Sequence, residues 1–375
     1  MRSTADTSQT FALYLPPGYT TERRWPVLFV LDPRGRALLG LKRFQEGAAR
    51  LGWVVLSSYN TLSDGPPEPN VTAVNAMLAW VQAHPSLDPT RLYLAGFSGT
   101  ARAALGFAVA LRGHVAGVIA VGGALGFAMG GPETAFAADS TFAYFGSAGT
   151  QDFNYEEVFA MADRFRTTRV PFRVVAFDGP HGWPPPDVCG DALDWLELRA
   201  MLGGRRAMDS GWVRARLAGE LARAAELERL GLWADALRLD EAIGRDYARW
   251  PEAKEATDRA PALRRSPVLA KYEAEVRRLA RVHVNLAFYE PRAYLANGSP
   301  GRALRMLEAA ATIGPIQGDA CVLLREALVA ATADQRARLA GQCGITFKNA
   351  STTRSDHHRR YRVSSASAWS AVRAG

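Results

Sequence analysis

Cysteine is scarce in this chain, and its scarcity excludes two kinds of protein. The 375 residues include three cysteines, Cys189, Cys321 and Cys343, which lie far apart. Small disulfide-held proteins carry an even and denser set of cysteines, and structural zinc sites need closely paired ligands. We therefore expect neither a disulfide framework nor a structural metal site.

Long hydrophobic runs are also missing. No stretch approaches the roughly 20 apolar residues of a transmembrane helix, so we expect no membrane span. The N-terminus lacks the basic-then-apolar layout of a signal peptide, which predicts a cytoplasmic protein. The first expected strand, over residues 10–15, begins very early, however. If the gene model had lost an upstream segment, the protein would instead be exported.

No dense basic run occurs before the C-terminal tail. The 45 Lys and Arg against 37 Asp and Glu give a net charge of +8, but the basic residues are scattered among acids. Nucleic-acid binding needs a basic patch or stripe, so no nucleic-acid partner is expected. Hydrophobic residues make up 48% of the chain, which is ample for a packed core, and the length favours two domains.

Strand and helix patterns alternate over the N-terminal half. Short apolar runs typical of strands occur at residues 10–15, 25–32, 53–59, 91–95, 115–121, 142–146 and 172–177. Helical patterns lie between or after them, at residues 36–51, 70–84, 101–110, 154–168 and 187–202. Strands that are apolar on both faces and alternate with helices predict an α/β three-layer sandwich around a mostly parallel, doubly wound sheet.

Strand patterns end at Gly203-Gly204, and Ala, Leu and Arg dominate beyond it. Two segments, 225–237 and 294–304, each combine a helix end, a turn with Gly and a helix that opens with an Ala-Leu pair. This arrangement resembles tetratricopeptide helix hairpins, and a plain helical bundle is the alternative. We predict an α/β domain over 1–204, a tetratricopeptide-like α-helical domain over 205–345 and a disordered basic tail over 346–375.

The pentad Gly96-Phe97-Ser98-Gly99-Thr100 lies between an expected strand and an expected helix. A serine at a sharp strand-to-helix turn, flanked by small residues, is the pattern of a nucleophile elbow. The pattern is Gly-x-Ser-x-Thr, so Thr100 departs from the usual final glycine and is expected to crowd the helix against the strand. The alternative is an ordinary strand-ending turn with a helix cap.

A serine nucleophile needs a histidine base that is held by a carboxylate. His181 follows the last expected strand, in a loop rich in Gly and Pro, and is the best placed of six histidines. Asp152 follows the preceding strand and completes the order Ser, Asp, His. Two alternatives stay open: Asp152 as the N-terminal residue of a helix, and Asp178 as the carboxylate that orients the ring.

Acyl transfer also needs donors for a developing oxyanion. We expect one from the backbone N–H of Gly99 and one from the loop after the strand at 25–32. Pro33 has no N–H, so Arg34 or Gly35 supplies the second donor. Asp32 either holds this loop in shape or caps the following helix.

Several motifs together resemble the α/β-hydrolase superfamily, and most closely bacterial esterase, depolymerase and dienelactone-hydrolase-like members. They are Tyr14-Leu-Pro-Pro-Gly-Tyr19, the strand at 25–32, Gly-x-Ser-x-Thr, Gly149-Thr-Gln-Asp152 and His181-Gly-Trp183. The resemblance covers residues 10–202. It implies a triad of Ser98, Asp152 and His181, a sheet of about eight strands in the full family, and no cofactor.

Two functions follow from these patterns. The first is a serine hydrolase of the carboxylesterase kind, acting on a small-molecule or peptidic acyl substrate through an acyl-enzyme, without metal or organic cofactor. The second is a catalytically weak hydrolase-like scaffold that binds protein partners through its helical repeats. The aromatic residues Tyr59, Phe97, Phe153 and Trp183 either line an apolar acyl site or serve in packing.

Overall fold

The computed structural model describes residues 1–63, 65–124, 142–267 and 269–271, together with residues 304, 332, 333, 336 and 337. The second tetratricopeptide-like segment, the basic tail, Cys321 and Cys343 lie outside the described residues. The structure therefore addresses the α/β half of the chain and the helices that directly follow it.

Seven strands form one sheet in the order β1-β3-β2-β4-β5-β6-β7. Their bounds are β1 Phe11–Tyr14, β2 Trp25–Leu31, β3 Val54–Ser58, β4 Leu87–Phe97, β5 Val115–Val121, β6 Ala143–Gln151 and β7 Phe172–Pro180. β1 pairs with β3 antiparallel, and the other neighbours are parallel. This confirms the predicted mostly parallel sheet, with one strand fewer than the eight of the full family in the part of the chain described.

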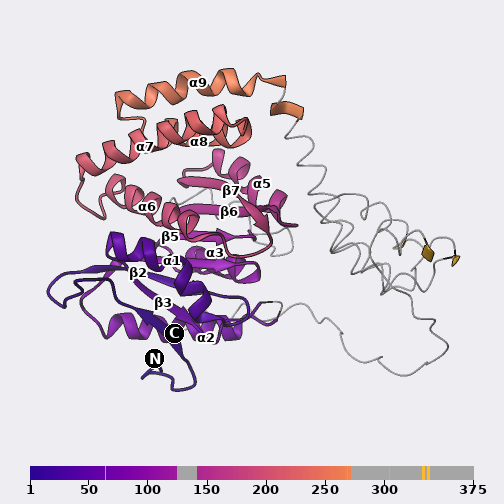
Figure 1. Cartoon of the computed structure of the whole chain (residues 1–375). Helices are drawn as coiled ribbons and strands as arrows, with labels where there is room; N and C mark the ends of the chain where they lie inside the picture. The colour runs from indigo at the N-terminus through magenta and orange to yellow at the C-terminus, as the bar shows by residue number, and fades with distance from the viewer. Residues whose placement is uncertain are drawn as a thin grey trace.

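Helices cover both faces of this sheet (Figure 1). Helices α1 (Ala37–Leu51) and α6 (Pro186–Leu202) pack on one face, and α2 (Glu68–Gln82), α3 (Gly99–Ala110) and α5 (Tyr155–Arg166) pack on the other. Strands β2 and β5 are buried along their whole length, since both of their faces contact helices. The three-layer α/β sandwich predicted from the alternating pattern is thus confirmed.

Three strands are longer than their apolar runs, and their extra residues position the site. β4 continues to Phe97, β6 continues to Gln151 and β7 continues to Pro180. Their carboxyl ends therefore present Ser98, Asp152 and His181 as the next residue in each case. Because these strands are parallel and adjacent or nearly so, the three residues meet at one edge of the sheet.

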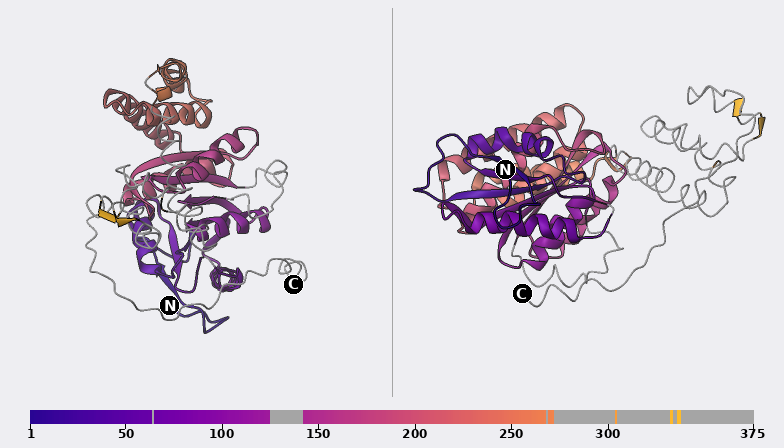
Figure 2. Two further views of the ribbon diagram at one scale, coloured as in Figure 1. Left: turned by 90° about the vertical axis from the view of Figure 1, so that its right-hand side faces the viewer. Right: turned by 90° about the horizontal axis from the view of Figure 1, so that it is seen from below.

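Three further helices continue the fold past the β7 edge of the sheet (Figures 1 and 2). They are α7 (Ser210–Arg229), α8 (Trp233–Asp246) and α9 (Lys254–Arg264), with a short 3₁₀ turn, η2 (Pro251–Ala253), before α9. Leu217 of α7 and Ile243 of α8 join the same apolar cluster as Trp195 of α6. Gly204 therefore interrupts the helices without interrupting the core.

A buried charged contact also joins the two parts of the chain. The guanidinium of Arg173 in β7 donates to both oxygens of Glu220 in α7, at 2.9 and 3.0 Å, and to Asp246 of α8 at 2.8 Å. The indole N–H of Trp195 donates to the same Asp246 carboxylate at 2.8 Å. The domain boundaries and the tetratricopeptide-like character of this region stay predictions. Within the described residues, no helix has the length and apolar character needed to cross a membrane.

Candidate active site

Ser98 occupies a strained turn between β4 and α3. Its φ of 57° and ψ of −127° make it the one non-glycine residue with positive φ among those the structure describes. Such a conformation costs roughly 1–3 kcal/mol and persists only where its surroundings enforce it. The neighbouring backbone is close enough to require glycine: a Cβ at Gly96 would lie 2.2 Å from the carbonyl oxygen of Thr100, and one at Gly123 would lie 2.5 Å from that of Ser98.

Ser98, His181 and Asp152 form a continuous hydrogen-bonded chain. Ser98 Oγ lies 3.0 Å from His181 Nε2, and His181 Nδ1 lies 2.9 Å from Asp152 Oδ1. The Ser98 side chain comes from the end of β4, Asp152 from the end of β6 and His181 from the loop after β7. The structure thus brings together the three residues that chain order predicted.

The carboxylate of Asp152 is enclosed, and the ring of His181 is largely so. Asp152 is 2% exposed, and its Oδ1 also accepts a hydrogen bond from the Asn154 N–H at 2.8 Å. Gly122 makes room for the pair, because a Cβ there would lie 2.7 Å from Asp152 Oδ2 and 3.1 Å from the imidazole. Sequence reasoning did not single out Gly122 or Gly123; the Gly-Gly pair directly after an apolar strand was the available signal.

Asp178, the other candidate carboxylate, is placed differently. It is exposed, and its carboxylate accepts a hydrogen bond from the Thr150 hydroxyl at 3.3 Å. The imidazole nitrogen that Asp178 would have to reach is already bonded to Asp152.

The loop after β2 differs from the expectation for a second oxyanion donor. The N–H of Arg34 donates to Asp32 Oδ1 at 2.9 Å, and the N–H of Gly35 donates to the Asp32 carbonyl at 3.1 Å. Both groups are satisfied inside their own loop, so neither is available to an oxyanion in this conformation. Gly99 is the first residue of α3, where an N–H has no acceptor within the helix.

Asp32 holds this loop in shape and ties it to the histidine loop. Its buried carboxylate accepts hydrogen bonds from the N–H groups of Arg34 and Arg36, from the Arg36 guanidinium and, at 2.8 Å, from the indole N–H of Trp183. Burial by itself would raise the pKa of Asp32, but these hydrogen bonds outweigh it and hold the pKa below its usual value. The charged carboxylate thus joins the β2 loop to the loop of His181.

Ser63 lies beside the turn at Ser98 and Gly99, which the sequence did not indicate. A Cβ at Gly99 would lie 2.5 Å from Ser63 Cβ, so the two backbones approach closely. Asn70 of α2 fixes the preceding residue: its side chain accepts from the Leu62 N–H at 3.0 Å and donates to the Leu62 carbonyl at 2.7 Å. The 61–63 loop therefore forms one wall beside Gly99.

Of the four aromatic residues named from the sequence, two lie beside His181, a third packs in the interior and the fourth is exposed. The rings of Phe153 and Phe97 lie against the His181 imidazole, with centroids 4.1 and 4.6 Å away. Trp183 is buried against Phe44 and Phe97, and Tyr59 is 41% exposed. Cys189 is buried, and burial raises the pKa of its thiol, which disfavours the reactive thiolate.

Comparisons with known proteins give fold-level similarities alone. No family model and no curated protein matches the chain. Among solved structures, a ferulic acid esterase is 16% identical, with a TM-score of 0.42, over 52% of this chain and 92% of its own. FphF, a fluorophosphonate-binding serine hydrolase of Staphylococcus aureus, is 15% identical, with a TM-score of 0.41, over 50% and 92%. The esterase Est2 of Thermogutta terrifontis is 13% identical, with a TM-score of 0.42, over 54% and 92%.

Proposed function

We propose that this chain is a serine hydrolase that cleaves carboxylic esters through an acyl-enzyme. The observation that supports the proposal is the contact chain from Ser98 Oγ to His181 Nε2, at 3.0 Å, and from His181 Nδ1 to Asp152 Oδ1, at 2.9 Å. Both distances lie within hydrogen-bond reach for a nucleophile, its base and the group that orients the base.

Ser98 acts as the nucleophile. His181 accepts the hydroxyl proton at Nε2 while its Nδ1–H donates to Asp152, and Ser98 Oγ forms a bond to the ester carbonyl carbon. The carbonyl oxygen becomes the oxyanion of a tetrahedral intermediate. The N–H of Gly99, at the start of α3, is the donor that we assign to it, and the N-terminal end of the helix favours the same negative charge.

His181 then returns the proton to the departing alkoxide, and the C–O bond to the alcohol breaks. The acyl group remains as an ester on Ser98. Water then takes the place of the alcohol, and His181 takes a proton from the water as its oxygen attacks the acyl carbon. The bond from the acyl carbon to Ser98 Oγ breaks, the carboxylic acid leaves, and His181 returns the proton to Ser98 Oγ. Each proton that leaves the nucleophile is thus carried by His181, and Asp152 stabilises the imidazolium that forms.

A fluorophosphonate probe on the full-length protein tests the proposal. We expect covalent labelling of Ser98 in the wild type, none in Ser98→Ala and strongly reduced labelling in His181→Ala. Hydrolysis of p-nitrophenyl butyrate is expected to follow the same order. A wild-type protein that is folded but is never labelled and does not cleave short p-nitrophenyl esters would contradict the serine-hydrolase proposal. It would favour the alternative, a catalytically weak hydrolase-like scaffold.

A matched pair of carboxylate variants tests the role of Asp152. Asp152→Asn is expected to lower kcat by up to about 10⁴-fold, because the amide favours the wrong imidazole tautomer. Asp178→Asn makes the same chemical change at an exposed aspartate 26 residues further along the chain, and kcat is expected to stay within a factor of about two. Equal losses in the two variants would overturn the assignment.

A further inference from the structure

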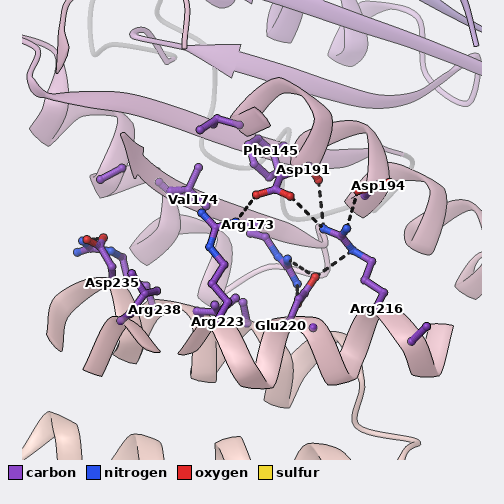
Figure 3. A pocket seen from close by; sticks show the side chains of 18 of the residues that line it. Phe145, Arg173, Val174, Asp191, Asp194, Arg216, Glu220, Arg223, Asp235 and Arg238 are labelled. Carbon is purple, nitrogen blue, oxygen red and sulfur yellow. Dashed lines mark hydrogen bonds and ion pairs between the residues drawn. The ribbon is translucent and has the colours of Figure 1, made fainter. Parts of the chain in front are cut away.

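A cavity lies where α6, α7 and α8 meet strand β7 (Figure 3). Its volume is about 420 Å³, and neither Ser98, Asp152 nor His181 lines it. Sites for small organic ligands occupy roughly 300–1,000 Å³, so this space is large enough for one. The proposed ester hydrolysis makes no use of it.

The cavity has a charged side with an excess of arginine. Its lining includes five arginines and four carboxylates, which are Arg50, Arg173, Arg216, Arg223, Arg238, Asp191, Asp194, Asp235 and Glu220. Two carboxylates are shared between arginines: Asp194 contacts Arg50 and Arg216, and Glu220 contacts Arg173 and Arg216. Counted as formal charges, the lining carries one positive charge more than negative. Asp246, which also contacts Arg173, lies outside the lining and is shared with Arg199.

Three of these charged residues lie on one face of α7. Arg216, Glu220 and Arg223 follow one another at helical spacing. Arg216 reaches Asp194 of α6 and Arg223 reaches Asp191 of α6 (Figure 3), whereas Glu220 contacts Arg173. The lining also includes apolar residues, among them Phe145, Val174 and Leu239. A ligand that fills the space therefore meets both hydrocarbon and guanidinium groups.

One buried donor among the lining residues lacks a partner. Arg173 lines the cavity and is 95% buried, yet in the described part of the chain its Nε–H has no hydrogen-bond partner. A buried donor without a partner costs roughly 1–3 kcal/mol, and a ligand acceptor that reaches it removes this cost. Gly219 of α7 lines the cavity at a solvent-exposed position, where a Cβ would meet nothing within 4 Å.

We propose that this cavity is a binding site for an organic monoanion with an apolar body, such as an aryl or alkyl monocarboxylate. One negative charge balances the excess arginine, and the carboxylate oxygens accept from guanidinium N–H groups. The hydrocarbon part packs against Phe145, Val174 and Leu239. A dianion exceeds the charge that the lining offers, and a neutral ligand leaves it unbalanced.

The probe that tests this site is 4-phenylbutyrate, measured by titration calorimetry on the full-length protein. Its neutral amide, 4-phenylbutyramide, has nearly the same shape and serves as the charge control. We expect the acid to bind at least about tenfold more tightly than the amide, since hydrogen bonds to charged groups are worth about 1.5–3 kcal/mol. Equal affinities, or no heat for the acid at millimolar concentration, would overturn the proposal.

Glycine-to-leucine variants locate the binding. Gly219→Leu places a side chain at the exposed mouth of the cavity and is expected to weaken binding of 4-phenylbutyrate at least about tenfold. Gly106 of α3 is also a mid-helix glycine without a neighbour within 4 Å of its added Cβ, but it does not line the cavity. Gly106→Leu is therefore the matched control and is expected to bind like the wild type. Undiminished binding in a folded Gly219→Leu would place the ligand elsewhere and overturn the assignment.

Two charge variants at partly exposed residues test the sign of the ligand's charge independently of the glycine variants. Arg223→Gln removes one positive charge and is expected to weaken binding about fivefold, whereas Asp191→Asn frees arginine N–H groups and is expected to tighten it by a similar factor. Both side chains are partly exposed, at 56% and 36%, so both variants are expected to fold. Effects of the same sign would contradict an anion site. Ester hydrolysis is not a readout in any of these experiments, so the site can fail while the proposed function holds.

Discussion

Removing the hydroxyl of Thr100 by substitution with valine is expected to weaken the base of the nucleophile turn. Thr100 is fully buried, and its Oγ1 donates to the Leu31 carbonyl of β2 at 2.5 Å. The same oxygen lies 2.8 Å from the carbonyl and 3.2 Å from the N–H of Phe97. One hydroxyl thus joins the start of α3 to the ends of two strands, directly beside Ser98.

The magnitude follows from what valine leaves behind. The change conserves shape, so no cavity forms, but the buried Leu31 carbonyl loses a partner, at a cost of about 1–3 kcal/mol. Thr100→Ser keeps the hydroxyl and removes one buried methyl group, which costs about 1 kcal/mol. Thr100→Gly loses both and adds a helix glycine, so we expect about 3–5 kcal/mol in total.

Urea unfolding at constant m-value measures these free energies, and the rate of fluorophosphonate labelling measures the effect on Ser98. Thr167→Val is the matched control, because the Thr167 hydroxyl also donates to a backbone carbonyl, at 2.8 Å, but is exposed to water. We expect about 0.5 kcal/mol or less there. A Thr100→Val protein as stable as Thr167→Val and labelled at the wild-type rate would refute the reasoning.

Three further predictions concern the loops, the elbow and the helices. The difference in unfolding free energy between wild type and Asp32→Asn is expected to shrink as pH falls below about 4. The pKa of Asp32 is lowered in the folded protein, so its charged form stabilises the fold above the unfolded pKa, and protonation removes that stability. A difference that does not change with pH in acid titrations would contradict this. Gly123→Ala is expected to lower kcat at least about tenfold, since its Cβ would lie 2.5 Å from the Ser98 carbonyl oxygen, and Gly65→Ala, at a position with open space, is the kinetic control. Truncation after Leu202 is expected to lower the melting temperature by more than about 10 °C, because it exposes apolar side chains of α6 that pack on α7 and α8; an unchanged melting curve would show that the two parts are independent.

Most of the α/β fold is predictable from local pattern. Strands buried on both faces leave continuous apolar runs, and Val115–Val121 is an example whose predicted and observed bounds coincide. The ends of strands are less predictable, because hydrogen bonding to a neighbour extends them past their apolar residues. Leu87 and Asp88 belong to β4 although Asp88 is polar, since Trp25 of β2 pairs with Leu87.

The convergence of the three residues of the proposed triad is predictable, because all three directly follow strands of one parallel sheet. Ser98, Asp152 and His181 each follow a strand, and parallel strands bring their carboxyl ends to one edge. The hydrogen bonding of the loop after β2 was less predictable. An N–H that follows a strand is visible in the sequence, but whether Arg34 or Gly35 is already bonded to Asp32 depends on the loop conformation.

The long-range contacts that fix the site cannot be predicted from local sequence patterns. Thr100 and Leu31 are 69 residues apart, and Asp32 and Trp183 are 151 residues apart. Each contact is a buried hydrogen bond whose partner is set by the packing of whole elements, so no local spacing announces it. A chain can therefore keep Gly-x-Ser-x-Thr, Asp152 and His181 and still lose the geometry, if either contact is removed. On this reasoning Thr100 stabilises the elbow instead of weakening it, because the buried hydroxyl takes part in bonds that a final glycine cannot make.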